Sequence, residues 1–108
     1  MTITLQPNEK IIKKGAANHW KGPESVGGKL FLTNQRLYFS SHSLNVQAHT
    51  LSIPLENIQK LEKHSSLGIV PNGLSITTTE SATEKFVLWG REKWIVNIEA
   101  QKQQNKST

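Results

Sequence analysis

The sequence predicts a mainly β fold: a small barrel of about seven antiparallel strands, capped by one C-terminal α-helix. Three observations lead to this fold class. Apolar and polar residues alternate along several short segments, as they do in strands with one buried face. Turn-forming residues separate these segments. After Gly90 the apolar residues adopt the spacing of an α-helix with one buried side.

The clearest strands form a predicted hairpin. Leu30 and Leu32 face one side of its first strand, and Leu37 and Phe39 face one side of its second strand. The polar residues 33–35 separate the two strands. A short polar turn between two alternating segments is typical of a β-hairpin, so we expect these four side chains in the core.

Five other segments complete the predicted strands. They alternate in the same way, the last two more weakly, and they lie at 51–55, 74–79, 85–89, 10–14 and 58–64. The sequence Pro71-Asn72-Gly73 predicts a hairpin turn, because Asn-Gly accepts the positive φ that a tight turn requires. Residues 15–28 contain four glycines and Pro23, so they are predicted to form a loop.

The segment 91–104 is predicted to be an amphipathic helix. Trp94, Ile95 and Ile98 occupy about 100° of a helical wheel, which gives the helix a single apolar stripe. No glycine or proline interrupts the segment. We expect the stripe to cover one mouth of the barrel, where burial of each side chain contributes about 1.5–3 kcal/mol.

The length of 108 residues predicts one domain with a single modest core. We expect this domain to span 1–108, with its folded core at about 9–100 and a frayed tail at 101–108. No apolar segment is long enough to cross a membrane. The first 14 residues lack the apolar centre of a signal peptide, so we expect a cytoplasmic protein.

The charge distribution favours an anionic partner. The chain has 13 lysines and arginines against 8 acidic residues, which gives a net charge of +5. Residues 1–36 hold six basic and two acidic residues, a net charge of +4. Such a segment attracts lipid headgroups, phosphates or nucleic acid, although charge of this size also serves solubility alone.

Missing residue types exclude several kinds of catalytic and metal site. Without cysteine there are no disulfides or thiolate zinc sites, and without aspartate there is no aspartate-based triad. His42 and His49 could approach one another, but zinc needs at least three protein ligands and no third lies close in sequence. We therefore expect the four histidines at the surface, and we predict no enzyme, no metal and no cofactor.

Three stretches of the chain resemble the GRAM domain, a branch of the pleckstrin-homology-like (PH-like) superfamily. They are GGKLFLTNQRLYFSS at 27–41, TLSIPLENIQKLEKHSS at 50–66 and KFVLWGREKWIVNI at 85–98. The resemblance implies a PH-like barrel of two near-orthogonal antiparallel sheets, plugged by the C-terminal helix. It also implies a binding or adaptor role rather than catalysis. Some relatives bind phosphoinositides or other lipids, and others bind proteins or have a structural role.

The PH-like pattern for inositol phosphates places clustered basic residues on the first two strands and the loop between them. A tryptophan beside lysines also suits a membrane interface. The candidate lipid- or anion-binding residues are therefore Lys13, Lys14, His19, Trp20, Lys21, Lys29 and Arg36. Two of them have a structural alternative: Trp20 could fold back as a lid over the core, and Arg36 could face Thr33 or a glutamate. The candidate core residues are Leu30, Leu32, Leu37, Phe39, Phe86, Trp94 and Ile98.

The preferred hypothesis is a non-enzymatic PH-like binding module that contacts anionic lipid headgroups, peripherally at a membrane, or a protein partner. One alternative is a small nucleic-acid-binding barrel, which the positive charge favours. No alternation of aromatic and basic residues marks a surface for base stacking, so nucleic acid is not the expected partner. The other alternative is a scaffold that associates through a β edge or the helix. The sequence leaves the oligomeric state and the ligand open.

Overall fold

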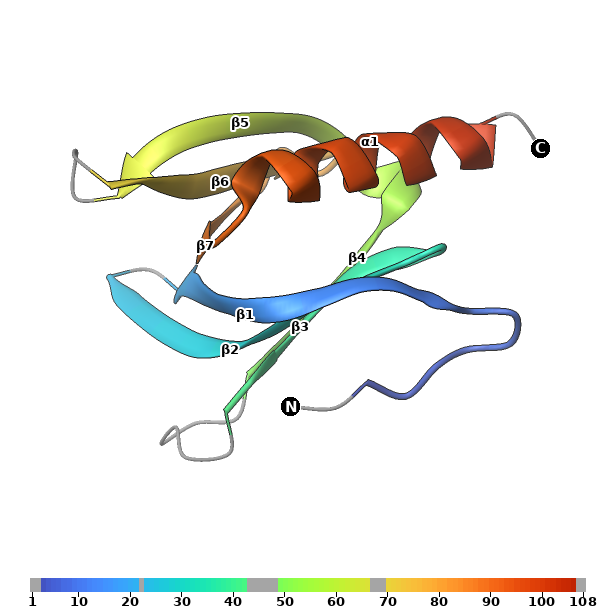
Figure 1. The fold of residues 1–108 in the computed structure, drawn as a ribbon, viewed down its shortest axis with the longest axis horizontal. Coiled ribbons are helices and arrows are strands. Elements are labelled where there is room, and N and C mark those ends of the chain that lie inside the picture. The colour runs from blue at the N-terminus through green and yellow to red at the C-terminus, as the bar shows by residue number, and fades with distance from the viewer. Residues whose placement is uncertain (1–2, 22, 43–48, 67–69, 107–108) are drawn as a thin grey trace.

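The computed structural model of the chain is a seven-stranded antiparallel sheet with one C-terminal helix, described over residues 3–21, 23–42, 49–66 and 70–106 (Figure 1). The elements are β1 (Ile11–Lys21), β2 (Glu24–Thr33), β3 (Arg36–Ser41), β4 (Thr50–Pro54), the 3₁₀ turn η1 (Leu55–Asn57), β5 (Ile58–Ser66), β6 (Val70–Thr78), β7 (Thr83–Leu88) and α1 (Arg91–Lys106). The predicted fold class, mainly β with a C-terminal helix, is confirmed.

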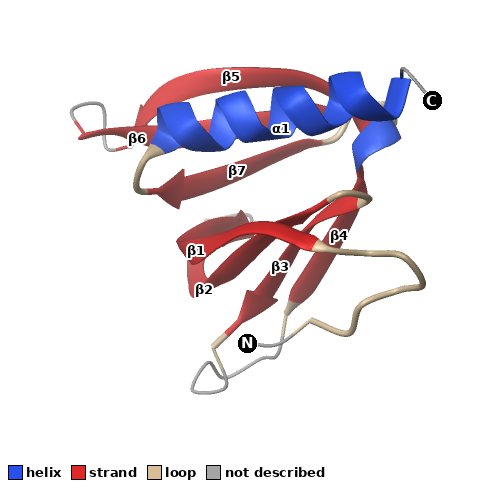
Figure 2. Ribbon diagram, turned by 45° about the vertical axis from the view of Figure 1, so that its right-hand side comes forward, coloured by secondary structure: helices blue, strands red, loops and turns tan. Residues whose placement is uncertain are grey.

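The strands follow the order β4-β3-β2-β1-β7-β6-β5, and every neighbouring pair is antiparallel. β1 joins the two halves of the sheet, because it pairs with β2 along almost its whole length and with β7 over residues 17–20. The sheet bends at this junction, so that β1–β4 and β5–β7 form two layers (Figure 2).

The sheet is not closed into a barrel, and the two sheets that the resemblance implied are one continuous sheet. β4 and β5 are its edges. They follow one another in the chain but do not pair, because η1 turns the chain through a corner between them. Helix α1 contacts η1, β1 and β6, so it spans the gap that strand pairing leaves open.

Helix α1 closes the core with its apolar stripe. Trp94 is 2% exposed and Ile98 is fully buried, and Trp94 packs against β1 beside Gly15. The helix continues through Lys106, so the frayed tail predicted at 101–108 was wrong for residues 101–106. Its last turn is held because the Asn105 side-chain amide donates a hydrogen bond to the Asn34 carbonyl oxygen at 3.0 Å.

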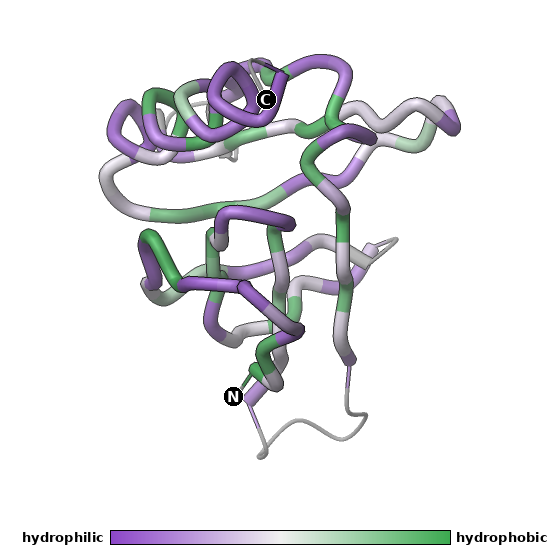
Figure 3. Tube along the Cα trace, turned by 90° about the vertical axis from the view of Figure 1, so that its right-hand side faces the viewer, coloured by the Kyte–Doolittle hydropathy of each residue, from purple (hydrophilic) through white to green (hydrophobic). Residues whose placement is uncertain are grey.

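Alternating side chains on the inner face of the sheet form the core. Figure 3 shows this pattern as hydrophobic positions interspersed with hydrophilic ones along the strands and the helix. The seven candidate core residues are all buried, namely Leu30, Leu32, Leu37, Phe39, Phe86, Trp94 and Ile98. Leu55 of η1 and Leu74 and Ile76 of β6 complete the same cluster.

A predicted loop and a predicted turn lie largely in strands. Residues 15–21 belong to β1, residues 24–28 belong to β2, and Pro71-Asn72-Gly73 lies inside β6. A Cβ at Gly28 would lie only 2.8 Å from Cζ of Phe39, and one at Gly73 would collide with the ring of His64. These glycines therefore make room for close neighbours. The loop prediction was wrong for 15–21 and 24–28, and the turn prediction was wrong for 71–73.

Candidate functional site

The β1–β2 hairpin separates the predicted basic residues onto two faces. Successive side chains of a strand point to opposite sides of the sheet. Ala17 and His19 of β1 are buried with the core, so Lys13 points to their side and Lys14 to the opposite side. The Lys13 ammonium lies 5.2 Å from the centre of a Trp94 ring, which is a cation–π contact with the helix. Lys14 is exposed.

Arg36 is held by internal contacts. Its Nε donates to Oε2 of Glu9 at 2.8 Å and its Nη2 donates to Oε1 at 3.2 Å, a bidentate pair with a carboxylate whose side chain is fully buried. The guanidinium also lies 4.8 Å from the Tyr38 ring centre. This geometry matches the structural alternative for Arg36, in which it faces a glutamate, and it leaves the guanidinium unavailable to an outside anion.

The Glu9 carboxylate is stabilised in its charged form. Burial alone would raise the pKa of the Glu9 carboxyl. Hydrogen bonds from Arg36, the Thr33 hydroxyl and the Gln6 backbone amide, with the charge of Arg36, outweigh burial and lower this pKa below its ordinary value. The cluster therefore behaves as a structural ion pair at neutral pH.

His19 is buried rather than exposed, so the expectation that the histidines lie at the surface was wrong for this residue. Only 3% of His19 is exposed. Its Nδ1 lies 2.8 Å from Nε2 of His49, and its Nε2 lies 2.7 Å from Oε1 of Glu84. The rings of Phe39 and Phe86 pack against it. The alternation of Ala17 and His19 along β1 is the sequence signal that places both side chains in the core.

His49 lies against His19 in the structure. His42 lies over Gly27, where a Cβ would be 3.2 Å from its Cδ2. The connection 43–48, on which the expected approach of His42 and His49 was centred, lies outside the described residues. Within the described residues no three potential ligands are gathered as a metal site would require.

Three lysines and two tryptophans share the face opposite the core. We call this the outer face: the outward positions of β1, β2 and β7 with the residue after β7. These positions are Lys14, Ala16, Asn18, Trp20, Ser25, Gly27, Lys29, Phe31, Thr83, Lys85, Val87 and Trp89. None of them is acidic. The outer face therefore has a positive potential that no carboxylate at these outward positions offsets.

Pairing of the strands sets the positions of these charges. Lys29 of β2 is the partner of Ala16, and Lys85 of β7 is the partner of Trp20. Lys14 and Lys85 are exposed and Lys29 is half-buried. Lys85 and Trp89 were not among the candidates. Their signal was the alternation beyond Phe86 and Leu88, which directs them outward.

A shallow groove of about 410 Å³ lies on the outer face. Trp20 and Trp89 line it together with Ala16 and Val87. Trp89 is 77% exposed. Trp20 is half-buried and does not fold over the inner core, so the lid alternative does not describe it. The side chain of Lys21 lies outside the described residues.

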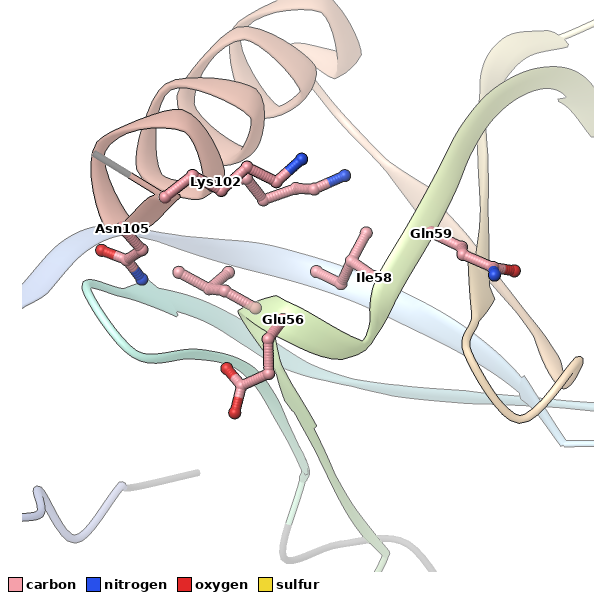
Figure 4. A pocket seen from close by; sticks show the side chains of 7 residues that line it. Glu56, Ile58, Gln59, Lys102 and Asn105 are labelled. Carbon is pink, nitrogen blue, oxygen red and sulfur yellow. The ribbon is translucent and has the colours of Figure 1, made fainter. Parts of the chain in front are cut away.

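A second cavity, of about 350 Å³, lies between η1 and the end of α1 (Figure 4). Ile58 and Leu55 form its apolar side, and Lys102 extends over it from the helix. The Lys102 side chain is only 13% exposed, and its ammonium lies 3.9 Å from Glu99. A lysine stem that covers apolar side chains in this way belongs to the packing of the helix on the corner.

Comparison with known proteins identifies the family. The family model described as the GRAM domain matches residues 1–93. A search of curated proteins found no match. Within the described part of the chain, no helix has the length and apolar character needed to cross a membrane.

Solved structures share the fold at low sequence identity. The C-terminal domain of an unknown protein from Leishmania infantum has a TM-score of 0.77 at 20% identity, with 90% of this chain and 87% of that chain covered. The Vps36 N-terminal PH domain has a TM-score of 0.71 at 15% identity, covering 97% and 87%. The Slm1-PH domain matches in complex with phosphoserine, with a TM-score of 0.68 at 14% identity and coverage of 86% and 96%. These likenesses show a PH-like fold.

Proposed function

The chain belongs to the GRAM domain family, and we propose that it is a non-enzymatic binding module that contacts anionic lipid headgroups at a membrane surface through its outer face. The observation that carries this proposal is the grouping of Lys14, Lys29 and Lys85 on a face whose described positions hold no carboxylate. Trp20 stands among them. GRAM and PH-like domains are typically binding modules, which supports a role without catalysis.

Ligands of structural neighbours support a phosphate-bearing headgroup. The Slm1-PH domain was solved in complex with phosphoserine and also with inositol-4-phosphate. Both ligands carry a phosphate ester, and lysine recognises phosphate as a compact positive charge. Lys14, Lys29 and Lys85 would supply that charge here, and Lys21 remains a proposed contact at the tip of the same hairpin.

Binding is expected to be weak and sensitive to salt. Each lysine near an anionic membrane contributes about 1 kcal/mol, and exposed charges are screened as ionic strength rises. Co-sedimentation with vesicles of phosphatidylcholine, with and without phosphatidylserine or phosphoinositide, measures this directly. We expect binding to the anionic vesicles at low salt and loss of it at high salt. Failure to bind any anionic vesicle at low salt would overturn the proposal.

A pair of matched variants distinguishes a site from net charge. Lys14→Glu with Lys29→Glu reverses two charges on the outer face and should weaken vesicle binding at least about tenfold. Lys93→Glu with Lys106→Glu makes the same change on exposed positions of α1 and should leave binding close to that of the unmodified protein. Equal losses in both would assign the attraction to net charge. Soluble inositol phosphate as a competitor separates recognition of the headgroup, which it blocks, from general surface attraction.

A further inference from the structure

We infer that the outer face lies flat against the bilayer, with Trp89 and Trp20 as the apolar anchors of the contact. This inference rests on the proposed function, since it states how that face meets the membrane. Trp89 is 77% exposed, more than any other large hydrophobic residue in the described part of the chain. An indole in this position suits the interfacial zone of a bilayer, where tryptophan is enriched.

The backbone fixes Trp89 in its outward position. Leu88 before it is 1% exposed and occupies the core, so alternation directs Trp89 to the opposite side. Gly90 after it has a φ of +69°, a conformation that favours glycine. Its carbonyl accepts a hydrogen bond from the Trp94 backbone amide at 3.2 Å, at the start of α1. Trp89 is therefore presented to solvent by a strand end and a helix start.

The groove offers mainly apolar surface. Ala16 and Val87 line it with the two indoles. The side chains of Asn18 and Ser25, which also line the groove, hydrogen-bond to each other at 3.0 Å. Trp20 and Ala16 are four residues apart on β1, so the face is about 13 Å long in this direction.

Lysines flank the groove from two strands, β2 and β7. Lys85 is the strand partner of Trp20, and Lys29 is the strand partner of Ala16. A bilayer surface provides the complementary arrangement, because phosphates meet the ammonium groups while the rings enter the interface.

An extended peptide fits this face less well. The groove lies over β1 and β7, and each of these strands pairs with a neighbour on both sides. Their main-chain N–H and C=O groups are therefore largely used within the sheet and are not available to hydrogen-bond a peptide backbone. Addition of a peptide strand requires an edge, and the edges of this sheet are β4 and β5. The observations therefore favour the lipid surface.

Fluorescence tests the anchor, because Trp94 is buried and reports no membrane contact. In Trp20→Phe, we expect anionic vesicles to shift the emission of Trp89 to the blue and brominated lipids to quench it. In Trp20→Phe with Trp89→Phe only Trp94 remains, and neither change should occur. Trp89→Ala should weaken vesicle binding about tenfold with an unchanged salt dependence. Val96→Ala, which removes an apolar side chain that is 64% exposed on α1, is the matched control and should change nothing.

The possible failures are distinguishable. In one outcome the unmodified protein binds anionic vesicles, but the emission of Trp89 does not change and Trp89→Ala binds normally. In that case this inference is wrong and the proposed function stands. A peptide then becomes the expected occupant of the groove. If the unmodified protein binds no vesicles, the proposed function itself fails.

Discussion

Arg36 and Lys29 lie on neighbouring strands with their side chains on the same side of the sheet, yet they have different surroundings. Residues 4–10 run beside the β2–β3 turn and bring the Glu9 carboxylate to Arg36. No described carboxylate pairs with Lys29. The comparison teaches that the availability of a basic residue depends on what a remote segment covers, rather than on its residue type or strand position.

The largest effect on stability should come from breaking the ion pair between Arg36 and Glu9. Arg36→Ala leaves the buried Glu9 carboxylate without its partner, and we expect it to destabilise the fold by about 3–5 kcal/mol. Lys29→Ala removes a cation that no described carboxylate pairs with, and it should change the free energy of unfolding by less than about 0.5 kcal/mol. Urea unfolding of the two variants and the unmodified protein measures both. A loss below about 1 kcal/mol for Arg36→Ala would place its ion pair among ordinary surface pairs.

The next largest effect concerns the two sides of β1. His19→Ala removes hydrogen-bond partners of His49 and Glu84 and leaves a cavity between Phe39 and Phe86. We expect a loss of about 2–3 kcal/mol in the free energy of unfolding. Asn18→Ala, one residue away on the outer face, should cost less than about 1 kcal/mol because its hydrogen bond is exposed. Similar losses in both variants would contradict the burial of His19.

The pH dependence of stability should identify Glu9 as the covered carboxylate. Folding lowers the pKa of Glu9, so the unfolded state takes up its proton at a higher pH than the folded state does. The stabilisation is therefore complete above the unfolded pKa of about 4.3 and is lost as the pH falls through the lower folded value. In Glu9→Gln this contribution is absent. At neutral pH the unmodified protein should have a higher urea midpoint than Glu9→Gln, and the two midpoints should converge as the pH falls. A difference between the midpoints that does not change with pH would contradict this assignment.

The core and the helix could be predicted because their signals are local. Alternation placed Leu30, Phe39 and Phe86 inside, and helical spacing placed Trp94 and Ile98 against the sheet. The glycines led to wrong predictions of a loop at 15–28 and of a turn at Gly73. Glycine is common in turns, but it also occurs in strands where a neighbour packs too closely for a Cβ atom. The sequence pattern does not say which of the two requirements is present.

The candidate site was less predictable, because charge alone does not report partners. Arg36 and Glu9 are 27 positions apart, and His19 and Glu84 are 65 positions apart. Neither contact has a short-range pattern. Lys85 and Trp89 join the outer face only because β7 pairs with β1, a long-range pairing between the ends of the domain. The strand pairing therefore determines which basic residues lie together. The sequence predicts where the strands lie along the chain but not which strands pair.

The smallest effect should come from Lys85, at the margin of the outer face. Lys85→Ala removes one cation beside Trp20 and leaves the groove intact, so vesicle affinity should fall only about fivefold. Stability should change by less than about 0.5 kcal/mol, because Lys85 is exposed and unpaired among the described residues. Lys60→Ala, an exposed lysine on the edge strand β5, is the control and should keep full affinity. If both variants bind vesicles with the same affinity, the membrane contact does not extend to β7, and only the β1–β2 part of the outer face meets the membrane.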